Sequence, residues 1–344
     1  MTSLLEPPPR PVLRRRAVRD LSGHNAPGAV AVMRGVSFMP RRDAPLWEQR
    51  LDLSLARAEA SLLRTPSALA LSGEAAALVQ GLWVRASEPD ITVIVPRRSG
   101  HTKVALAEGT HVEQGRRTDV PWRRGAVLRR SVVPLEPDEV IERGGLRVTS
   151  PMRTGVDCAF DLPARESITI LDSAMRALVD PDRRRPEQAE QRWAGVRAEL
   201  LSKVEAQRGR RGAVRARAAA AVASPFSESP GESLLRWQVL ALGLPKPALQ
   251  ARVDDDERLR SYYLDLAWPE LRLALEYDGR GKYGALGDAW EEKERQDAIH
   301  AKGWTFRRFT SRHLADRRLL ERDVLAAFPR EVRVSARPVH ALLV

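Results

Sequence analysis

Apolar and polar residues follow two different periods along this chain, and the changes between them mark its expected elements. From Leu46 to Leu63 apolar residues recur at helical spacing, and Pro66 ends the predicted helix. Ser72 then caps a second predicted helix, SGEAAALVQGLW, with a glycine near its end. From Asp90 to Val148 the residues alternate or run apolar between Gly and Pro, which predicts a small sheet.

The N-terminal residues give a weaker pattern. Residues 1–30 begin with MTSLLEPPPRPVLRRR and are rich in Pro and Gly, so we expect a loose arm with at most one helical turn. The alternation in AVAVMRGVSFMP then predicts a strand that ends at Pro40.

Helical spacing returns after Ser150, in SPMRTGVDCAF and in ESITILDSAMRALV. The polar stretch DPDRRRPEQAEQR separates these segments from a further helix, which we expect from about Trp193 to Glu205. A basic run follows, whose five arginines are Arg208, Arg210, Arg211, Arg215 and Arg217. Two readings stay open for this run: a phosphate-binding helix between domains, or a solvated helix face.

From Ser224 onward the pattern predicts the order α-β-β-β-α-β-α. The expected elements are a helix at 230–242, strands at 248–253, 259–267 and 271–277, a helix at 286–302, a strand at 304–309 and a helix at 313–328. Gly243 and Gly303 stand where helix C-termini favour a left-handed residue.

The chain as a whole is therefore predicted to be a mixed α/β protein, α+β overall, with more than one domain. The expected divisions are a flexible arm at 1–30, a mixed α+β domain at 31–180, a basic helical connector at 181–223, a core domain at 224–330 and a tail at 331–344.

The stretch LDLAWPELRLALEYDGRGKY, from Leu264 to Tyr283, concentrates acidic residues in what reads as a β-hairpin. If its turn has two or four residues, Asp265 lies opposite Ala274 and Glu276 is its diagonal neighbour, so that the two acids share one face. Asp278 joins them, and the glycines after it let the chain bring Lys282 toward the same place. Such a cluster is costly in a sheet core unless a cation lies in it.

These residues resemble the PD-(D/E)xK nuclease superfamily, and within it the group similar to very-short-patch-repair endonucleases. The resemblance covers the C-terminal 120 residues. It rests on Asp265, Glu276, Asp278-Gly279, Lys282-Tyr283 and the helix segment EKERQD, followed by GWTFRRFTSRHL. It implies a restriction-endonuclease-like core and hydrolysis of phosphodiester bonds.

The resemblance implies Asp265 and Glu276 as ligands of Mg²⁺ or Mn²⁺, which would spread the charge that develops on phosphoryl oxygens. The lysine of the superfamily pattern stands two residues after the glutamate, where this chain has Asp278. Three alternatives follow: Lys282 takes the role from the next loop, Asp278 is a third ligand, or the site is inactive.

The resemblance also implies Glu232 as a residue that reaches the metal through water. Ser229-Pro230-Gly231-Glu232 is at the same time a capping box, and the two roles can coexist. Lys293 and Asp297 have the i, i+4 spacing of a surface ion pair, and a contact of Lys293 with nucleic acid is the alternative.

Residues 30–180 resemble the type IV toxin-antitoxin abortive-infection antitoxin family, on the segments MRGVSFMP, LSGEAAALVQGLW and LRVTSPMRTGVDCAF. This likeness implies a degenerate winged-helix wing, and a cognate toxin or a homodimer as partner. The helix-turn-helix that precedes the wing in that family would have to lie in the short, Pro-rich arm.

Charge adds a partner class to this picture. The net charge is +12, but residues 224–344 hold 20 Lys and Arg against 19 Asp and Glu, leaving 37 against 26 for residues 1–223. An excess of this kind favours nucleic acid, DNA first, although a solvated arginine-rich surface is the alternative. The single cysteine, Cys158, excludes internal disulfides and points to the cytoplasm, with no expected signal peptide or membrane span.

Three hypotheses result from the sequence. The first is a metal-dependent DNA endonuclease whose basic N-terminal region holds DNA. The second is a catalytically inert nucleic-acid-binding transcriptional regulator or antitoxin of a toxin-antitoxin or phage-defence system. The third is a protein-binding scaffold.

Overall fold

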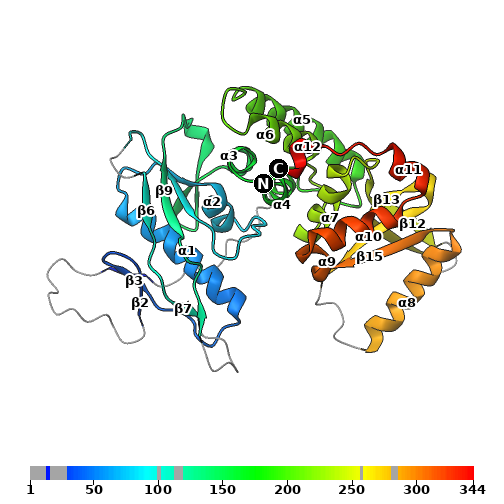
Figure 1. Ribbon diagram of the computed structural model, residues 1–344, viewed down its shortest axis with the longest axis horizontal. Coiled ribbons are helices and arrows are strands. Elements are labelled where there is room, and N and C mark those ends of the chain that lie inside the picture. Colours follow the sequence, from blue (N-terminus) through cyan, green and yellow to red (C-terminus); the bar gives the residue numbers. More distant parts are fainter. Residues whose placement is uncertain (1–12, 16–28, 99–101, 112–118, 256–258, 280–285) are drawn as a thin grey trace. The chain divides into compact units, whose positions relative to one another are not determined.

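A computed structural model shows an α+β protein that divides into two compact units, Met1–Asp161 and Leu162–Val344. We call them the N-terminal unit and the C-terminal unit (Figure 1). The division falls within the range 31–180 that the sequence assigns to one domain. The structure describes residues 13–15, 29–98, 102–111, 119–255, 259–279 and 286–344.

The N-terminal unit is built on a six-stranded sheet with the order β10-β11-β4-β5-β9-β6, beside a three-stranded sheet β1-β3-β2 and the pair β7-β8. The sheet predicted between Asp90 and Val148 is confirmed, as is the helix from Leu46. The elements are β1 (Leu13–Arg15), β2 (Val30–Met33), β3 (Val36–Phe38), α1 (Leu46–Arg64), β4 (Ala70–Ser72), α2 (Gly73–Val79), β5 (Ile91–Ile94), β6 (Lys103–Ala105), β7 (Thr110–His111), β8 (Val120–Pro121), β9 (Val127–Ser131), the short 3-10 helix η1 (Pro137–Glu139), β10 (Val140–Arg143), β11 (Leu146–Thr149) and α3 (Pro151–Asp161).

Two predictions for the start of this unit are wrong. The segment AVAVMRGVSFMP is a hairpin of β2 and β3 and not one strand, because Gly35 takes the positive φ of 74° that a tight turn requires. The arm before it contributes β1, which pairs antiparallel with β3. Residues 1–12 and 16–28, the rest of the predicted arm, lie outside the described residues.

The predicted cap of α2 is also different. Ser72 stands at the N-cap, but its hydroxyl donates to the buried Asp157 carboxylate at 2.8 Å and makes no cap hydrogen bond. The hydroxyl therefore joins α3 to the sheet.

The C-terminal unit confirms the predicted order α-β-β-β-α-β-α from Ser224 onward and places three further helices before it. Its elements are α4 (Ala164–Val179), α5 (Pro186–Glu205), α6 (Ala213–Val222), α7 (Pro230–Ala241), β12 (Ala248–Asp255), β13 (Arg260–Trp268), the short 3-10 helix η2 (Pro269–Leu271), β14 (Leu273–Asp278), α8 (Leu286–Ala301), β15 (Thr305–Thr310), α9 (Ser311–Ala315), α10 (Arg317–Ala327), α11 (Arg330–Ser335) and α12 (His340–Leu343).

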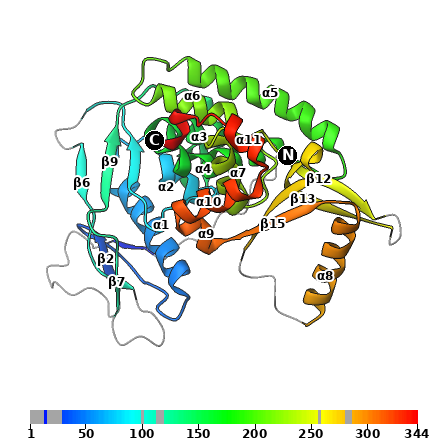
Figure 2. The ribbon, with the colours of Figure 1, turned by 45° about the vertical axis from the view of Figure 1, so that its right-hand side comes forward.

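A four-stranded sheet with the order β12-β13-β14-β15 forms the centre of this unit. The first three strands pair antiparallel, and β15 pairs parallel to β14 because α8 carries the chain back between them. One face packs on Ile299 of α8, and the other packs on apolar residues of α7, α9 and α10. Figure 2 shows α8 on one side of the strands and α7, α9 and α10 on the other.

Several boundaries differ from the prediction. The helix expected from Trp193 begins at Pro186, because proline suits the first turn and the polar residues after it form an exposed helix face. The helix expected at 313–328 is divided at Asp316, whose carboxylate accepts from the N–H groups of Arg318 at 3.0 Å and Leu319 at 3.2 Å and so starts α10. The predicted tail contains α11 and α12.

The hairpin register differs from the expectation and is important for the site. The turn comprises residues 269–272, so Trp268 pairs with Leu273 and Ala267 pairs with Ala274. Asp265 is therefore not opposite Ala274. Continued by one residue past Leu266 and Leu275, this register places Asp265 directly across from Glu276.

The two glycines predicted at helix C-termini both have positive φ, 72° at Gly243 and 79° at Gly303, as expected. A Cβ at Gly243 would lie 1.8 Å from the Arg337 carbonyl oxygen, whereas a Cβ at Gly303 would meet open space. We predict that Gly303→Ala costs about 1 kcal/mol for the left-handed backbone alone. Gly243→Ala should cost about 2–4 kcal/mol, because the segment at Arg337 must also move. Urea unfolding followed by circular dichroism measures both, and equal losses would contradict the packing at Arg337.

Candidate functional site

The pairing of β13 with β14 ends where the predicted acids begin. The last paired residues are Leu266 and Leu275, and beyond them the backbone N–H of Tyr277 donates to Asp265 Oδ2 at 2.9 Å. A carboxylate thus accepts the hydrogen bond that a strand carbonyl would otherwise take. This bond fixes Asp265 beside Glu276 and Tyr277.

Strand β12 is irregular at the same place. Leu249 pairs with Leu266 and Ala251 pairs with Leu264, so Gln250 lies across from Asp265 in the register. Gln250 has a φ of 51°, an uncommon backbone conformation for a residue other than Gly. Such strained residues often occur at functional sites, because surrounding contacts must hold them.

The side chains on either side of this irregularity pack on different clusters. Leu266 belongs to the cluster with α7 and α10, whereas Leu264 belongs to the cluster with Ile299 and Trp304. In a regular strand these two residues share one face. The change of face at Asp265 leaves its carboxylate between the two apolar clusters.

Glu232 comes to the same place from the first turn of α7. Half of the predicted capping box is present: Ser229 Oγ accepts from the Glu232 N–H at 3.2 Å, but the Glu232 carboxylate accepts from the Ser229 hydroxyl at 2.8 Å and not from the Ser229 N–H. Glu232 Oε2 accepts from the Glu228 N–H at 2.8 Å and from Gln250 Nε2 at 3.2 Å. The capping role therefore stands, and it also directs this buried carboxylate toward β12.

The pKa of Asp265 reflects its burial and, after that, the neighbouring acids. Burial first, then the negative charges of Glu232 and Glu276, raise the pKa of the Asp265 carboxyl to about 7, while the Tyr277 N–H acts in the opposite direction. Burial likewise raises the pKa of Glu232, although the Glu228 N–H and the Ser229 hydroxyl oppose it. These three acids, Glu232, Asp265 and Glu276, are called the acidic cluster below.

Glu276 is held from α8. Arg295 donates to both Glu276 oxygens, with one distance of 3.0 Å, and to the Tyr263 carbonyl at 3.2 Å. Arg308, which lies beside Glu276 in the parallel register of β15, forms an ion pair with Glu292. The Glu276 charge is thus already neutralised by a two-point arginine contact, whereas Asp265 has no such partner among the described residues.

The structure describes one of the two residues considered for the lysine role, Asp278 and Lys282. Asp278 is the last residue of β14 and is half-buried; burial, and then its charge, raise the pKa of the Tyr277 hydroxyl. Lys282 lies outside the described residues.

Asp265 and Glu276 supply the hard oxygen ligands that Mg²⁺ and Mn²⁺ prefer, and a cation would offset both the burial of the Asp265 charge and its repulsion by Glu232 and Glu276. In this arrangement both carboxylate oxygens of Glu276 accept hydrogen bonds from Arg295. Among the residues that the structure describes, no group of three or more His, Cys, Asp or Glu is arranged to hold a metal ion. The carboxylate oxygens of Asp265 and Glu276 are suited to a cation, which could bind both only if Arg295 released its contact with Glu276.

The predicted nucleic-acid contacts lie in the turn between α5 and α6, on α6, and on α8, the helix that also carries Arg295. Arg208, Arg210 and Arg211 occupy the turn between α5 and α6, where Arg208 and Arg211 are exposed. Arg215 and Arg217 lie on α6, and Arg217 pairs with Glu205 at 3.0 Å. Lys293 is exposed on α8.

Aromatic and histidine side chains near the hairpin have structural contacts. Trp268 is buried, donates to the Pro245 carbonyl at 2.9 Å and packs edge-on against Phe328. His313 accepts from the Thr310 N–H at 3.0 Å, and His300 packs on Phe306. Trp268 therefore packs in the core of the C-terminal unit.

Several basic side chains of the N-terminal unit bind acids of the same unit. Glu88, 3% exposed, pairs with Arg57 at 3.2 Å and with His111 at 2.9 Å, and Asp90 pairs with Arg123 and Arg129 at 2.9 and 2.6 Å. No helix in the described part of the chain is both long and apolar enough to cross a membrane.

Sequence reasoning missed Arg308, Arg183 and Glu228 as neighbours of the acids. Arg308 could have been predicted, because a parallel pairing of the third and fourth strands of the core brings it beside Glu276. Arg183 could not have been predicted from the local pattern, since its contact with Glu228 joins a connecting segment to the start of α7.

No family model and no solved structure matches the chain. It is similar to two proteins of Mycobacterium tuberculosis, from strains CDC 1551 and H37Rv, both described as uncharacterized. Each is 32% identical over 161 residues, which is 47% of this chain and 54% of the relative. The chain thus spans about half the length of these curated relatives.

The raised pKa of Asp265 gives a prediction for stability without divalent ions. The unfolded carboxyl has a pKa of about 3.9, so between about pH 4 and 7 the folded state binds the extra proton and the free energy of unfolding falls as pH rises, by about 2–4 kcal/mol. Asp265→Asn should reduce this fall while its amide oxygen still accepts from Tyr277. Urea unfolding in EDTA at pH 4.5 and 7.5 measures it. The exposed Glu270→Gln in the same hairpin is the control, and identical pH dependence in all three proteins would contradict the burial of the charge.

Proposed function

We propose that this protein is a metal-dependent DNA endonuclease whose active site is the acidic cluster in the C-terminal unit. The observation that carries the proposal is the gathering of Glu232, Asp265 and Glu276 from α7, β13 and β14, with the Asp265 carboxyl at a pKa of about 7. Burial is the first cause of this raised pKa and the charges of Glu232 and Glu276 add to it, and groups with perturbed pKa values gather at functional sites. The α-β-β-β-α-β-α order of the unit, with its resemblance to PD-(D/E)xK nucleases, supports the same class.

In this proposal Asp265 and Glu276 hold Mg²⁺ or Mn²⁺. The bound ion would stabilise charge on the phosphoryl oxygens and lower the pKa of a water. Arg295 keeps Glu276 in place in the absence of the ion and remains on the same face of the sheet to contact a phosphate. Glu232 is fixed by its capping contacts and by Gln250, so that it can orient a water beside Asp265.

The basic excess of residues 1–223 supports a role in holding DNA for this reaction. Residues of the N-terminal unit such as Arg64, Arg97 and Arg124 are exposed cations in its described part. Because phosphate neutralisation releases counterions, this contribution weakens as salt rises and needs no metal bound at the acidic cluster.

A second candidate is a nucleic-acid-binding regulator that keeps the core without catalysis. The two-point contact of Arg295 with Glu276 is the observation that favours it, because this contact uses both oxygens of a proposed ligand. Asp278 at the lysine position of the family pattern agrees with this candidate.

The endonuclease proposal predicts that the purified chain nicks supercoiled plasmid with Mg²⁺ or Mn²⁺ and not with EDTA. Asp265→Asn should lower the rate at least about 100-fold, because one ligand charge is lost. Glu270→Gln, an exposed acid in the turn of the same hairpin, should cut at the wild-type rate. Gel analysis of timed samples measures the rates, and cutting that Asp265→Asn leaves unchanged would exclude the acidic cluster.

The regulator candidate predicts DNA binding that weakens with salt, is not strengthened by Mg²⁺ or Mn²⁺ relative to EDTA, and gives no cut product. Fluorescence anisotropy with the products resolved on a gel tests both features in one sample. Metal-stimulated cutting excludes this candidate.

A further inference from the structure

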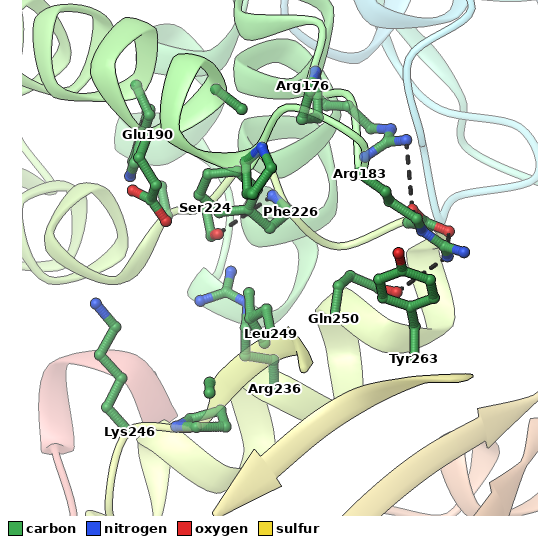
Figure 3. A pocket seen from close by; sticks show the side chains of 18 of the residues that line it. Arg176, Arg183, Glu190, Ser224, Phe226, Arg236, Lys246, Leu249, Gln250 and Tyr263 are labelled. Atoms are coloured by element: carbon green, nitrogen blue, oxygen red, sulfur yellow. Dashed lines mark hydrogen bonds and ion pairs between the residues drawn. The ribbon is translucent and has the colours of Figure 1, made fainter. Parts of the chain in front are cut away.

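The C-terminal unit contains a cavity of about 690 Å³ beside the acidic cluster. Its walls come from α4, the segment that leads into α5, helices α5, α6 and α7, the loop before α7, and strands β12 and β13. This volume lies within the range of about 300–1,000 Å³ that is typical of ligand sites. Figure 3 shows Lys246 and Arg236 extending into the same space, with Glu190 on the opposite wall.

The charge of the walls favours an anion. Seven arginines and lysines line the cavity against three acids, Asp182, Glu190 and Glu228. Some of the cations serve the fold, since Arg236 is bound by Asp172 at 2.5 Å and Arg183 by Glu228 at 2.7 Å. Arg184, Arg197 and Lys246 are exposed and form no ion pair with another described residue.

The same walls offer an apolar surface. Phe226 and Leu249 are half-buried lining residues, and Tyr263 carries the Arg183 guanidinium over its ring at 4.9 Å. A planar apolar group can therefore pack here while a negatively charged group meets the cations. A nucleotide combines these two features, and stacking on aromatic and arginine planes binds bases without regard to sequence.

Three contacts join the cavity to the acidic cluster. Gln250 lines the cavity and donates to Glu232 at 3.2 Å. The Glu228 side chain lines it while the Glu228 N–H donates to Glu232 at 2.8 Å. Tyr263 lines it, and its carbonyl accepts from Arg295, which holds Glu276. A strand with one nucleotide in the cavity would continue directly toward the carboxylates.

We propose that this cavity receives one unpaired nucleotide of a DNA strand whose backbone lies across the acidic cluster. The inference rests on the proposed endonuclease function and narrows its substrate to DNA with an unpaired base. A paired base cannot enter a concave site, whereas an extruded or bulged one can. Lys246 contacts its phosphate side, and Phe226 packs on the base.

The test uses the full chain with Asp265→Asn, in EDTA at fixed salt, so that cutting does not interfere. Fluorescence anisotropy compares three labelled DNAs of one sequence: fully paired, with one extra unpaired nucleotide, and with an abasic residue at that extra position. The unpaired nucleotide should tighten binding by about tenfold over paired DNA, and removal of its base should abolish most of this gain in affinity.

Variants locate the effect. Lys246→Glu should abolish the preference for the unpaired nucleotide, whereas Arg330→Glu, the same charge change on α11 outside the cavity, should keep it. Phe226→Ala should lower only the difference between the base-bearing and abasic DNAs. Thermal unfolding by circular dichroism confirms that each variant is folded.

Equal affinity for the three DNAs, or loss of the preference with Arg330→Glu as well, would overturn the inference. Metal-dependent cutting of fully paired DNA at the rate of bulged DNA would overturn it and leave the endonuclease standing. Selective binding of the unpaired nucleotide with no cutting at any metal concentration would support the nucleotide-binding role of the cavity and exclude the endonuclease activity.

Discussion

The hydrogen bond from the Tyr277 N–H to the Asp265 carboxylate is the contact on which the arrangement of the site depends. It satisfies a backbone donor at the point where the β13–β14 pairing ends, so the strands can diverge without a buried unpaired N–H group. The same bond draws a carboxylate into the sheet, between Glu232 on α7 and Glu276 on β14. The end of a sheet ladder and the concentration of negative charge thus have one structural cause.

The element order of the C-terminal unit could be predicted because its signals are local: periodicity, and glycines such as Gly243 and Gly303 that end helices. The hairpin register could not. It depends on where β13 ends, and Trp268 is kept in the strand by burial and by its bond to the Pro245 carbonyl, which are tertiary contacts. A shift of the turn by one residue moved the partner of Asp265 from Ala274 to Glu276.

The site shows the same limit. Period two in the strands predicted that the two acids share a face, and the capping box placed Glu232 at the start of α7. The positive φ of Gln250 and the hold of Arg295 on Glu276 have no signal in the local pattern, because partners distant in the chain impose them. The cavity was missed for a related reason: its outer wall comes from a polar segment before α5 that reads as a solvated linker.

The helix that carries Glu232 has a consequence for the order of folding. Trp237 of α7 donates to the Leu342 carbonyl, 105 residues later, and Arg165 of α4 donates to the Leu314 carbonyl across 149 residues. Contacts of such long range form late, since loop closure must precede them. During synthesis, α4 and α7 emerge long before the segments that complete their packing. The helix that positions Glu232 therefore completes its packing only when the segment at Leu342 is in place.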